Sequence, residues 1–224
     1  MVKRLNEKKN PPKKPEKKSE VVSKEDKLTK DTFFCTEKTK SQEEAIKEKL
    51  APLQGSILGK PMIKIDILSQ RPVLVPYCLL VYNLYVDRSI GIIKKSLDQN
   101  LEEGIVYDMN EGHPFHYDIY EEGELPLRKK NLTAELKEFM LKETPDSQMF
   151  EQTEEYIQRK VAKKFYGREG KLTLKKKKYF YRPAIEMETA YKNGNTNTRY
   201  AYLDDFGLMH EHIFGLKVRV ETGG

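Results

Sequence analysis

The sequence predicts an α+β protein with two related antiparallel β-hairpin lobes, a helix pair between them, and a disordered basic N-terminal tail. Three patterns support this fold class: a Lys-rich start without apolar periodicity, two stretches of period-2 alternation, and helical periodicity between those stretches. Hydrophobic residues make up 38% of the 224 residues and charged residues 34%. Because typical domains contain about 45–50% and 25%, part of the chain is expected not to fold.

That part is residues 1–40, which we predict to be a disordered Lys-rich tail. Residues 1–31 contain 11 Lys or Arg and 6 Asp or Glu, so most of the formal net charge of +6 lies there. Such a segment buries too little apolar surface to offset an ordering cost of ~1–2 kcal/mol per residue. It is either a solubilising leader or an electrostatic arm for phosphate-rich partners. Phe33, Phe34 and Cys35 are expected to dock on the domain or on a partner.

Residues 41–224 are predicted to form a single α+β domain. Ser41 and Glu44 have the spacing of a helix start, and the helix would end near Pro52. The residues after Pro61 alternate between apolar and polar, which predicts a half-buried strand. A second, mostly apolar strand follows in residues 73–86, kinked or entered at Pro76.

The domain contains an internal repeat, at about residues 61–120 and 168–222. A shift of 107 residues superposes the two copies, and each has an alternating strand, an apolar patch, a proline and a second strand. In the second copy, Asn193 and Gly194 predict a tight hairpin turn. The alternative is a chance similarity between two β-rich stretches. The superposed pairs are Ile65 and Leu172, Ile67 and Leu174, Val73 and Phe180, Leu74 and Tyr181, and Pro76 and Pro183.

The segment between the two copies has the residue pattern of helices. Asn131 is positioned to cap a first helix, and Thr144, Pro145 and Asp146 form a second start signal. Apolar residues then recur every four positions from Met149, and Gly167 would end this helix. We expect the helix pair to pack on one face of the sheet.

Charge is divided sharply within the domain. Residues 101–127 contain eight acids and no Lys or Arg, whereas residues 159–182 contain eleven bases and one acid. The basic segment is therefore the candidate binding surface, for an acidic protein surface or for nucleic acid, which Lys beside aromatic residues can grip. It could also pair with the acidic segment, inside the molecule or across an oligomer, or remain a solvated face. Its candidate residues are Lys160, Lys163, Lys164, Arg168, Lys175, Lys176, Lys177, Lys178 and Arg182.

The four histidines form two pairs, His113 with His116 and His210 with His212. If the repeats faced each other, these pairs could converge on a divalent metal such as zinc. The alternative is that they are loop or strand-end histidines with no shared ligand. No glycine-rich phosphate loop, nucleophile elbow or other catalytic signature accompanies them, so we predict no metal site and no cofactor.

The function expected from these patterns is that of a non-enzymatic adaptor or subunit of a larger assembly, binding a protein partner through charged surfaces. A nucleic-acid-associated protein and a metal-dependent enzyme at the histidines are the alternatives. No apolar run reaches the ~18 residues of a membrane helix, so no membrane span is expected. Two cysteines make no disulfide framework, which favours the cytoplasm, or the nucleus of a eukaryote.

Overall fold

The computed structural model describes residues 32–57, 60–61, 63–86, 99–120, 123–191 and 194–206, and the tail prediction for residues 1–31 lies outside them. The described chain is a mixed α+β fold, as predicted. Its helices are α1 (Gln42–Gln54), α2 (Ala134–Glu138) and a continuous segment of α3 (Asp146–Ile157), η1 (Gln158–Lys163) and α4 (Lys164–Tyr166). Its strands are β1 (Thr32–Thr36), β2 (Ser56–Ile57), β3 (Lys60–Pro61), β4 (Ile65–Val86), β5 (Gln99–Asp108), β6 (His113–Tyr117), β7 (Leu127–Asn131), β8 (Lys171–Tyr191) and β9 (Thr196–Tyr202).

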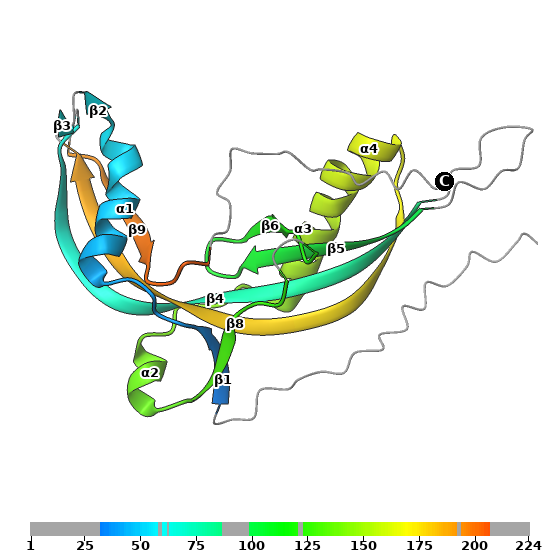
Figure 1. Cartoon of the computed structure of the whole chain (residues 1–224), viewed down its shortest axis with the longest axis horizontal. Coiled ribbons are helices and arrows are strands. Elements are labelled where there is room, and N and C mark those ends of the chain that lie inside the picture. Colours follow the sequence, from blue (N-terminus) through cyan, green and yellow to red (C-terminus); the bar gives the residue numbers. More distant parts are fainter. Residues whose placement is uncertain are drawn as a thin grey trace, which may run out of the picture.

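Seven of these strands form one sheet in the order β6-β5-β4-β8-β1-β7, with β9 paired to β8. Figure 1 shows β4 and β8 running side by side as an arc across the molecule, with α1 near one end and α3 and α4 near the other. The hairpins β4–β5 and β8–β9 are antiparallel and both belong to this sheet. The long strands β4 and β8 are antiparallel neighbours, with Val75 opposite Arg182 near their middle.

Both long strands continue through their prolines, whereas the sequence analysis expected two strands in each stretch. The carbonyl oxygen of Pro76 accepts a hydrogen bond from Met109 at 3.0 Å, and that of Pro183 accepts one from Leu203 at 2.9 Å. The ladders with β5 and β9 begin at the next residue, Tyr77 and Ala184. Pro76 therefore lies just outside the β4–β5 ladder and Pro183 just outside the β8–β9 ladder. The N–H that each proline lacks interrupts no strand pairing there.

Each long strand also contains one β-bulge. Leu68 has no partner between Ile67 and Ser69, and Lys175 has none between Leu174 and Lys176. A bulge leaves one residue unpaired, bends its strand and increases the local twist. The two bulges lie in the first half of each strand and contribute to the arc that β4 and β8 form.

Two helical segments, α1 and the continuous α3–η1, pack on the same face of the sheet. Near one end, α3 and η1 cover alternate residues of β4 and β5, as the four-residue periodicity after Met149 predicts. Near the other end, α1 covers Ile185 and Met187 of β8. The buried cluster under α3 and η1 comprises Cys78, Leu80, Tyr82, Leu84, Val86, Ile105, Tyr107, Met109, Met149, Ile157, Val161 and Ala162.

The opposite face of the sheet carries a second apolar core. It contains Val75, Tyr77 and Leu79 of β4, and Tyr117 and Leu125 pack with them. The residues of β4 between positions 73 and 82 are buried on both faces. This accounts for the nearly continuous apolar run there, in place of simple alternation.

The folded region begins earlier than predicted. β1 pairs with β7 along its whole length and with β8 at Cys35 and Tyr181, so residues 32–40 are not part of a tail. Phe33 and Cys35 are 2% and 1% exposed, which confirms that this aromatic segment docks on the domain. The boundary prediction failed because a five-residue strand is too short to show a period, and its pairing partners are distant in sequence.

The predicted turn and cap signals are mostly confirmed. Ser41 and Glu44 form a capping box at the start of α1. Gly167 ends α4 with a φ of 70°, and Gly194 adopts a φ of 83° between β8 and β9. The helix predicted from Asn131 begins instead after the Thr133 cap, because residue 131 still belongs to β7.

Candidate partner-binding surfaces

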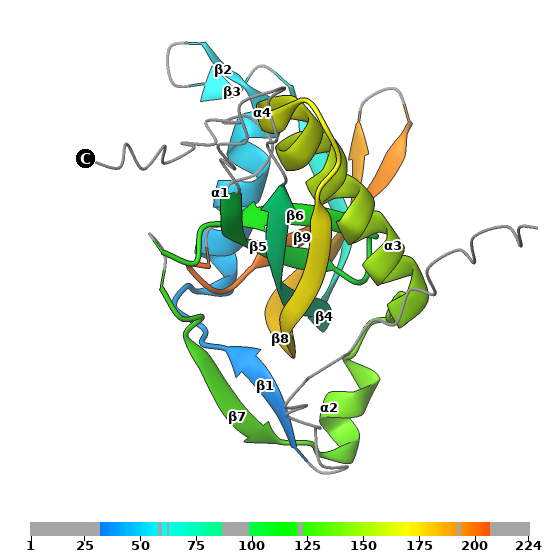
Figure 2. The same ribbon diagram turned by 90° about the vertical axis from the view of Figure 1, so that its right-hand side faces the viewer.

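Most of the predicted basic residues lie along the connection from η1 through α4 into β8, at the end of the molecule where β8 begins. Lys160 and Lys163 lie in η1, Lys164 in α4, Arg168 in the turn that follows, and residues 175–178 in the first half of β8. Figure 2 shows this end, where α4 leads directly into β8 and α3 runs beside the strand. The side chain of Gln158 secures the connection through two hydrogen bonds to the backbone of Gly170, at 2.7 and 3.0 Å.

Two of the four consecutive lysines are partly buried. The Lys177 ammonium lies 3.4 Å from Asp146 and 5.4 Å from the Phe150 ring centroid. That of Lys178 lies 4.6 Å from the ring centroid of Phe34. These two lysines contribute to packing as well as charge.

The other two lysines are exposed. Lys175 is the bulge residue of β8 and forms no ion pair with the described part of the chain. Lys176 lies 3.9 Å from Glu124, whose side chain is 95% exposed, so this pair is weak. Lys175 and Lys176 therefore offer the most accessible charge of the four.

Arg182 is a correction to the predicted surface. It is 2% exposed, and its guanidinium donates to Asp204 at 2.6 and 3.0 Å and to the carbonyl oxygen of Phe206 at 2.7 Å. The ring centroid of Tyr202 lies 3.9 Å away. Arg182 therefore cannot contact a partner in this structure. The alternation of Phe180, Arg182 and Ala184 on one strand face was the available signal of burial.

A buried polar network extends from this ion pair. Thr36 donates to Asp204 at 2.5 Å, which ties β1 to the segment after β9. The hydroxyl of Tyr77 donates to Asp108 at 2.8 Å and lies 2.5 Å from the hydroxyl of Tyr202. Burial raises the pKa of Tyr77 well above its usual value, so this hydroxyl remains a donor. No local pattern in the sequence indicates this partnership.

The acidic and basic segments meet little within the described chain. Glu103 lies 3.4 Å from His116 in the neighbouring strand β6. Between the two segments, the ion pair found among the described residues is that of Lys176 with Glu124.

The described histidines do not share a face. His113 and His116 are three positions apart on β6, and successive side chains of a strand point to opposite sides. His210 and His212 lie outside the described residues. Within the described part of the chain, no three His, Cys, Asp or Glu side chains are grouped closely enough to hold a metal ion.

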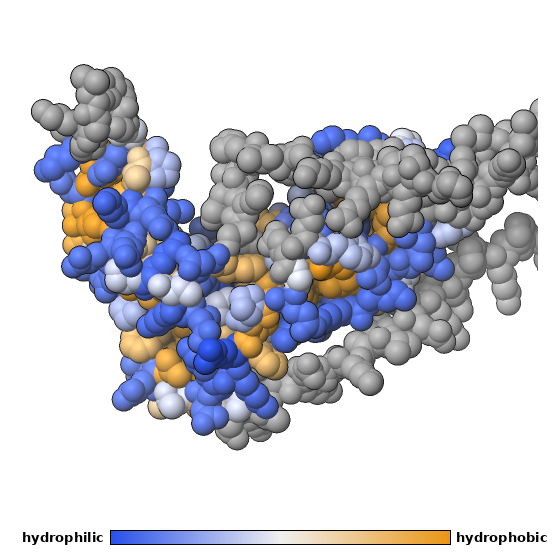
Figure 3. Space-filling model, in the orientation of Figure 1, coloured by the Kyte–Doolittle hydropathy of each residue, from blue (hydrophilic) through white to orange (hydrophobic). Residues whose placement is uncertain are grey.

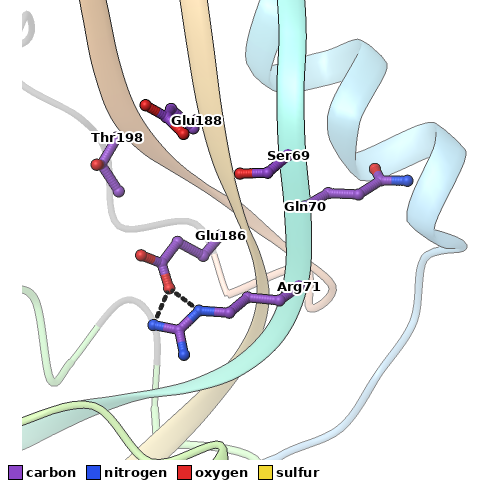
Figure 4. Close-up of a pocket in the computed structure, with 6 residues that line it drawn as sticks. All are labelled: Ser69, Gln70, Arg71, Glu186, Glu188 and Thr198. Atoms are coloured by element: carbon purple, nitrogen blue, oxygen red, sulfur yellow. Dashed lines mark hydrogen bonds and ion pairs between the residues drawn. The ribbon is translucent and has the colours of Figure 1, made fainter.

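A shallow polar pocket lies where β4, β8 and β9 run together, and the sequence analysis did not identify it. Its volume is about 200 Å³. Figure 4 shows Arg71 paired with Glu186 across the strands, with Ser69, Glu188 and Thr198 beside them. The Arg71 guanidinium donates to Glu186 at 2.6 and 2.7 Å, so the charges in the pocket are partly satisfied already.

The first half of β4 is an exposed strand with apolar side chains. Residues 66–72 are all exposed, and Ile67 and Leu68 are 39% and 55% exposed. Figure 3 shows an apolar patch near this end of the molecule, one of several on a face that also carries many hydrophilic residues. Residues 77–86 of β4 pair with β5, but no described strand pairs with the outer side of residues 66–72.

No family model, curated protein or solved structure matches this chain. None of the described helices combines the length and apolar character needed to cross a membrane.

Proposed function

We propose that this protein is a non-enzymatic adaptor or subunit of a larger assembly that binds an acidic protein partner through its basic end. The observation that supports this proposal is the run of exposed and partly exposed cations in η1, α4, the turn after α4 and the first half of β8, namely Lys160, Lys163, Lys164, Arg168 and residues 175–178. Exposed charges at one end steer association and favour partners of opposite sign.

Nucleic-acid binding through the same cations is the second candidate. Stacking on bases would require accessible aromatic rings beside the lysines. Phe180 and Tyr181 are 1% and 8% exposed, and the Tyr179 hydroxyl donates to Asp146 at 2.6 Å. These rings are committed to the fold, which favours the protein partner. A metal-dependent enzyme at the paired histidines remains the third hypothesis, and it depends on His210 and His212.

The test compares charge-reversed variants in purification from the source cells. Lys175→Glu/Lys176→Glu is the test variant, and Lys47→Glu/Lys137→Glu is the control because its two lysines are exposed on α1 and α2. A protein partner retained after nuclease treatment and a heparin wash, and lost from the test variant alone, is the expected result. Nucleic acid bound near ~10⁻⁸ M with a steep salt dependence, and no protein partner, would overturn the proposal.

We also propose that the two halves of the fold are related by a local two-fold axis, in line with the repeat. Val75 and Arg182 are opposite each other in the β4–β8 ladder and are 107 residues apart. A two-fold axis passing between them would exchange these two residues, and with them all residues that are 107 positions apart. The bulge residues Leu68 and Lys175 share that separation. Equivalent helices, α1 and α3, lie on the same face of the sheet.

A reducing compartment, the cytoplasm or a eukaryotic nucleus, is part of the same proposal. Cys35 and Cys78 are buried and unpaired, and burial raises the pKa of both thiols. Such cysteines behave as small apolar side chains and are unreactive as thiolates.

A further inference from the structure

One edge of the sheet is open along the basic end of β8. Residues 171–178 pair with β4 on one side. On the other side, the ladder with β9 begins at Ala184 and the pairing with β1 is at Tyr181, so no described strand accompanies residues 171–178. Unpaired N–H and C=O groups on such an edge can accept a strand from another chain.

The direction of the backbone groups follows from a hydrogen bond further along β8. The carbonyl oxygen of Pro183 accepts from Leu203, which lies on the side of β8 away from β4. Alternate residues of an antiparallel strand point their backbone groups to the same side. The N–H and C=O groups of Lys177 therefore point to the open side. Nearer the start of β8, the bulge at Lys175 changes the phase.

The side chains along this edge select the strand that can be added. Lys171, Lys175 and Lys176 are exposed, and Lys163 from η1 lies near the start of the strand, paired with Glu169 at 2.9 Å. Lysines on an edge oppose pairing with basic or neutral strands. They favour an acidic strand, because opposite charges directly across a strand pair attract.

We propose that residues 171–178 of β8 form a docking edge for an extended acidic segment of the partner protein, which adds to the sheet as a further strand. This inference rests on the proposed function and specifies how the basic end binds. Strands as basic as residues 1–24, with nine bases and three acids, do not suit this edge. The edge is thus selective for an acidic strand over a basic one.

The test uses the full-length chain and a fluorescent synthetic octapeptide of alternating Glu and Val. Two further peptides have alternate backbone nitrogens methylated, one for each of the two phases. In an added strand, only every second backbone N–H faces the edge of the sheet and donates a hydrogen bond to it. The peptide methylated at those nitrogens should bind about tenfold more weakly, and the other methylated peptide should bind like the parent. Fluorescence anisotropy at physiological salt measures these affinities.

Charge variants complete the test. Lys175→Glu/Lys176→Glu should weaken binding of the parent peptide about tenfold, and Lys175→Gln/Lys176→Gln should fall between this variant and the wild type. Lys47→Glu/Lys137→Glu should leave the affinity unchanged. Circular dichroism establishes that each variant is folded, and the Gln variant provides the measurement if the Glu variant is not.

The outcomes separate the inference from the proposed function. Loss of binding on charge reversal, with both methylated peptides equal to the parent, means that charge alone binds the partner and that no strand is added. If neither the charge-reversed variant nor either methylated peptide shows weaker binding, the inference and the proposed function are both overturned. Binding of an oligothymidylate in place of the peptide, lost in the same variants, supports the nucleic-acid alternative and also overturns the inference.

Discussion

The first halves of β4 and β8 occupy matching places in the sheet but differ in chemistry. Each is an edge with one bulge, and each precedes a proline at the start of a neighbouring ladder. The bulge residue is Leu68 in β4, 55% exposed, and Lys175 in β8. The backbone geometry of the two edges is thus alike, and the side chains decide what each edge can bind.

The centre of the sheet shows a second contrast between the halves. Val75 and Arg182 face each other and are both buried, at 0% and 2% exposure. The apolar side chain needs only packing, whereas the guanidinium requires Asp204 and the carbonyl oxygen of Phe206. The second half therefore depends on the segment after β9 in a way that the first half does not.

The largest expected effect comes from breaking this central ion pair. Arg182→Met should lower the free energy of unfolding by about 3–5 kcal/mol, because Asp204 is left charged and buried. Val75→Ala, at the facing position, should cost about 2 kcal/mol from lost packing. Urea denaturation measures both.

The double variant Arg182→Met/Asp204→Asn controls for the buried charge. It should recover most of the loss, since neither remaining side chain needs a charged partner. A double variant no more stable than Arg182→Met would show that packing, rather than the uncompensated carboxylate, dominates the loss.

A second comparison concerns two buried hydroxyl groups 107 residues apart. Among the described residues, the Tyr82 hydroxyl has no hydrogen-bond partner, whereas Thr189 donates to the carbonyl oxygen of Asn197 at 3.0 Å. Tyr82→Phe should raise the free energy of unfolding by about 1 kcal/mol, and Thr189→Val should lower it by about 1–2 kcal/mol. Equal losses in thermal or urea denaturation would contradict the assignment of Tyr82 as unsatisfied.

Exchanging the bulge residues tests whether side chains alone distinguish the two edges. Leu68→Lys and Lys175→Leu should each change the free energy of unfolding by less than about 0.5 kcal/mol, because both positions are exposed. Lys175→Leu should increase self-association, since it removes a charge that opposes edge pairing. Sedimentation velocity over a range of concentrations measures this, and Leu68→Lys should show no increase.

The smallest expected effect concerns how the equivalent helices α1 and α3 begin. α1 has a capping box, whereas Pro145 before α3 provides no side-chain cap. Hydrogen bonds from the backbone and side chain of Ser41 lower the pKa of the Glu44 carboxyl. Its contribution to stability is therefore present at neutral pH and is lost as the pH falls below about 4.

Glu44→Gln should lower the thermal midpoint slightly at pH 7 and leave it unchanged near pH 2, where the carboxyl of the wild type is protonated as well. Glu43→Gln, one residue earlier in the same turn, is the matched control because Glu43 takes no part in the capping box. An equal effect of Glu44→Gln at both pH values would show that the carboxylate charge contributes nothing.

Short-range signals in the sequence identified much of the fold. Alternation, the Ser41 capping box, and the glycines at positions 167 and 194 determined element types and several ends, because each depends on residues a few positions apart. Composition located the basic segment, which the structure distributes over η1, α4 and β8. The 107-residue shift between the two β-rich repeat copies was enough to propose that they are equivalent.

Contacts between distant segments decided the rest. The pairing of β4 with β8, the docking of β1 and the burial of Arg182 against Asp204 join residues far apart in the chain. Local sequence cannot specify them, because period-2 alternation tells which residues share a strand face but not which strand or side chain lies beside them. A lysine run is exposed or partly buried according to its neighbours in space, and this is why Lys175 and Lys177 differ although only one residue separates them.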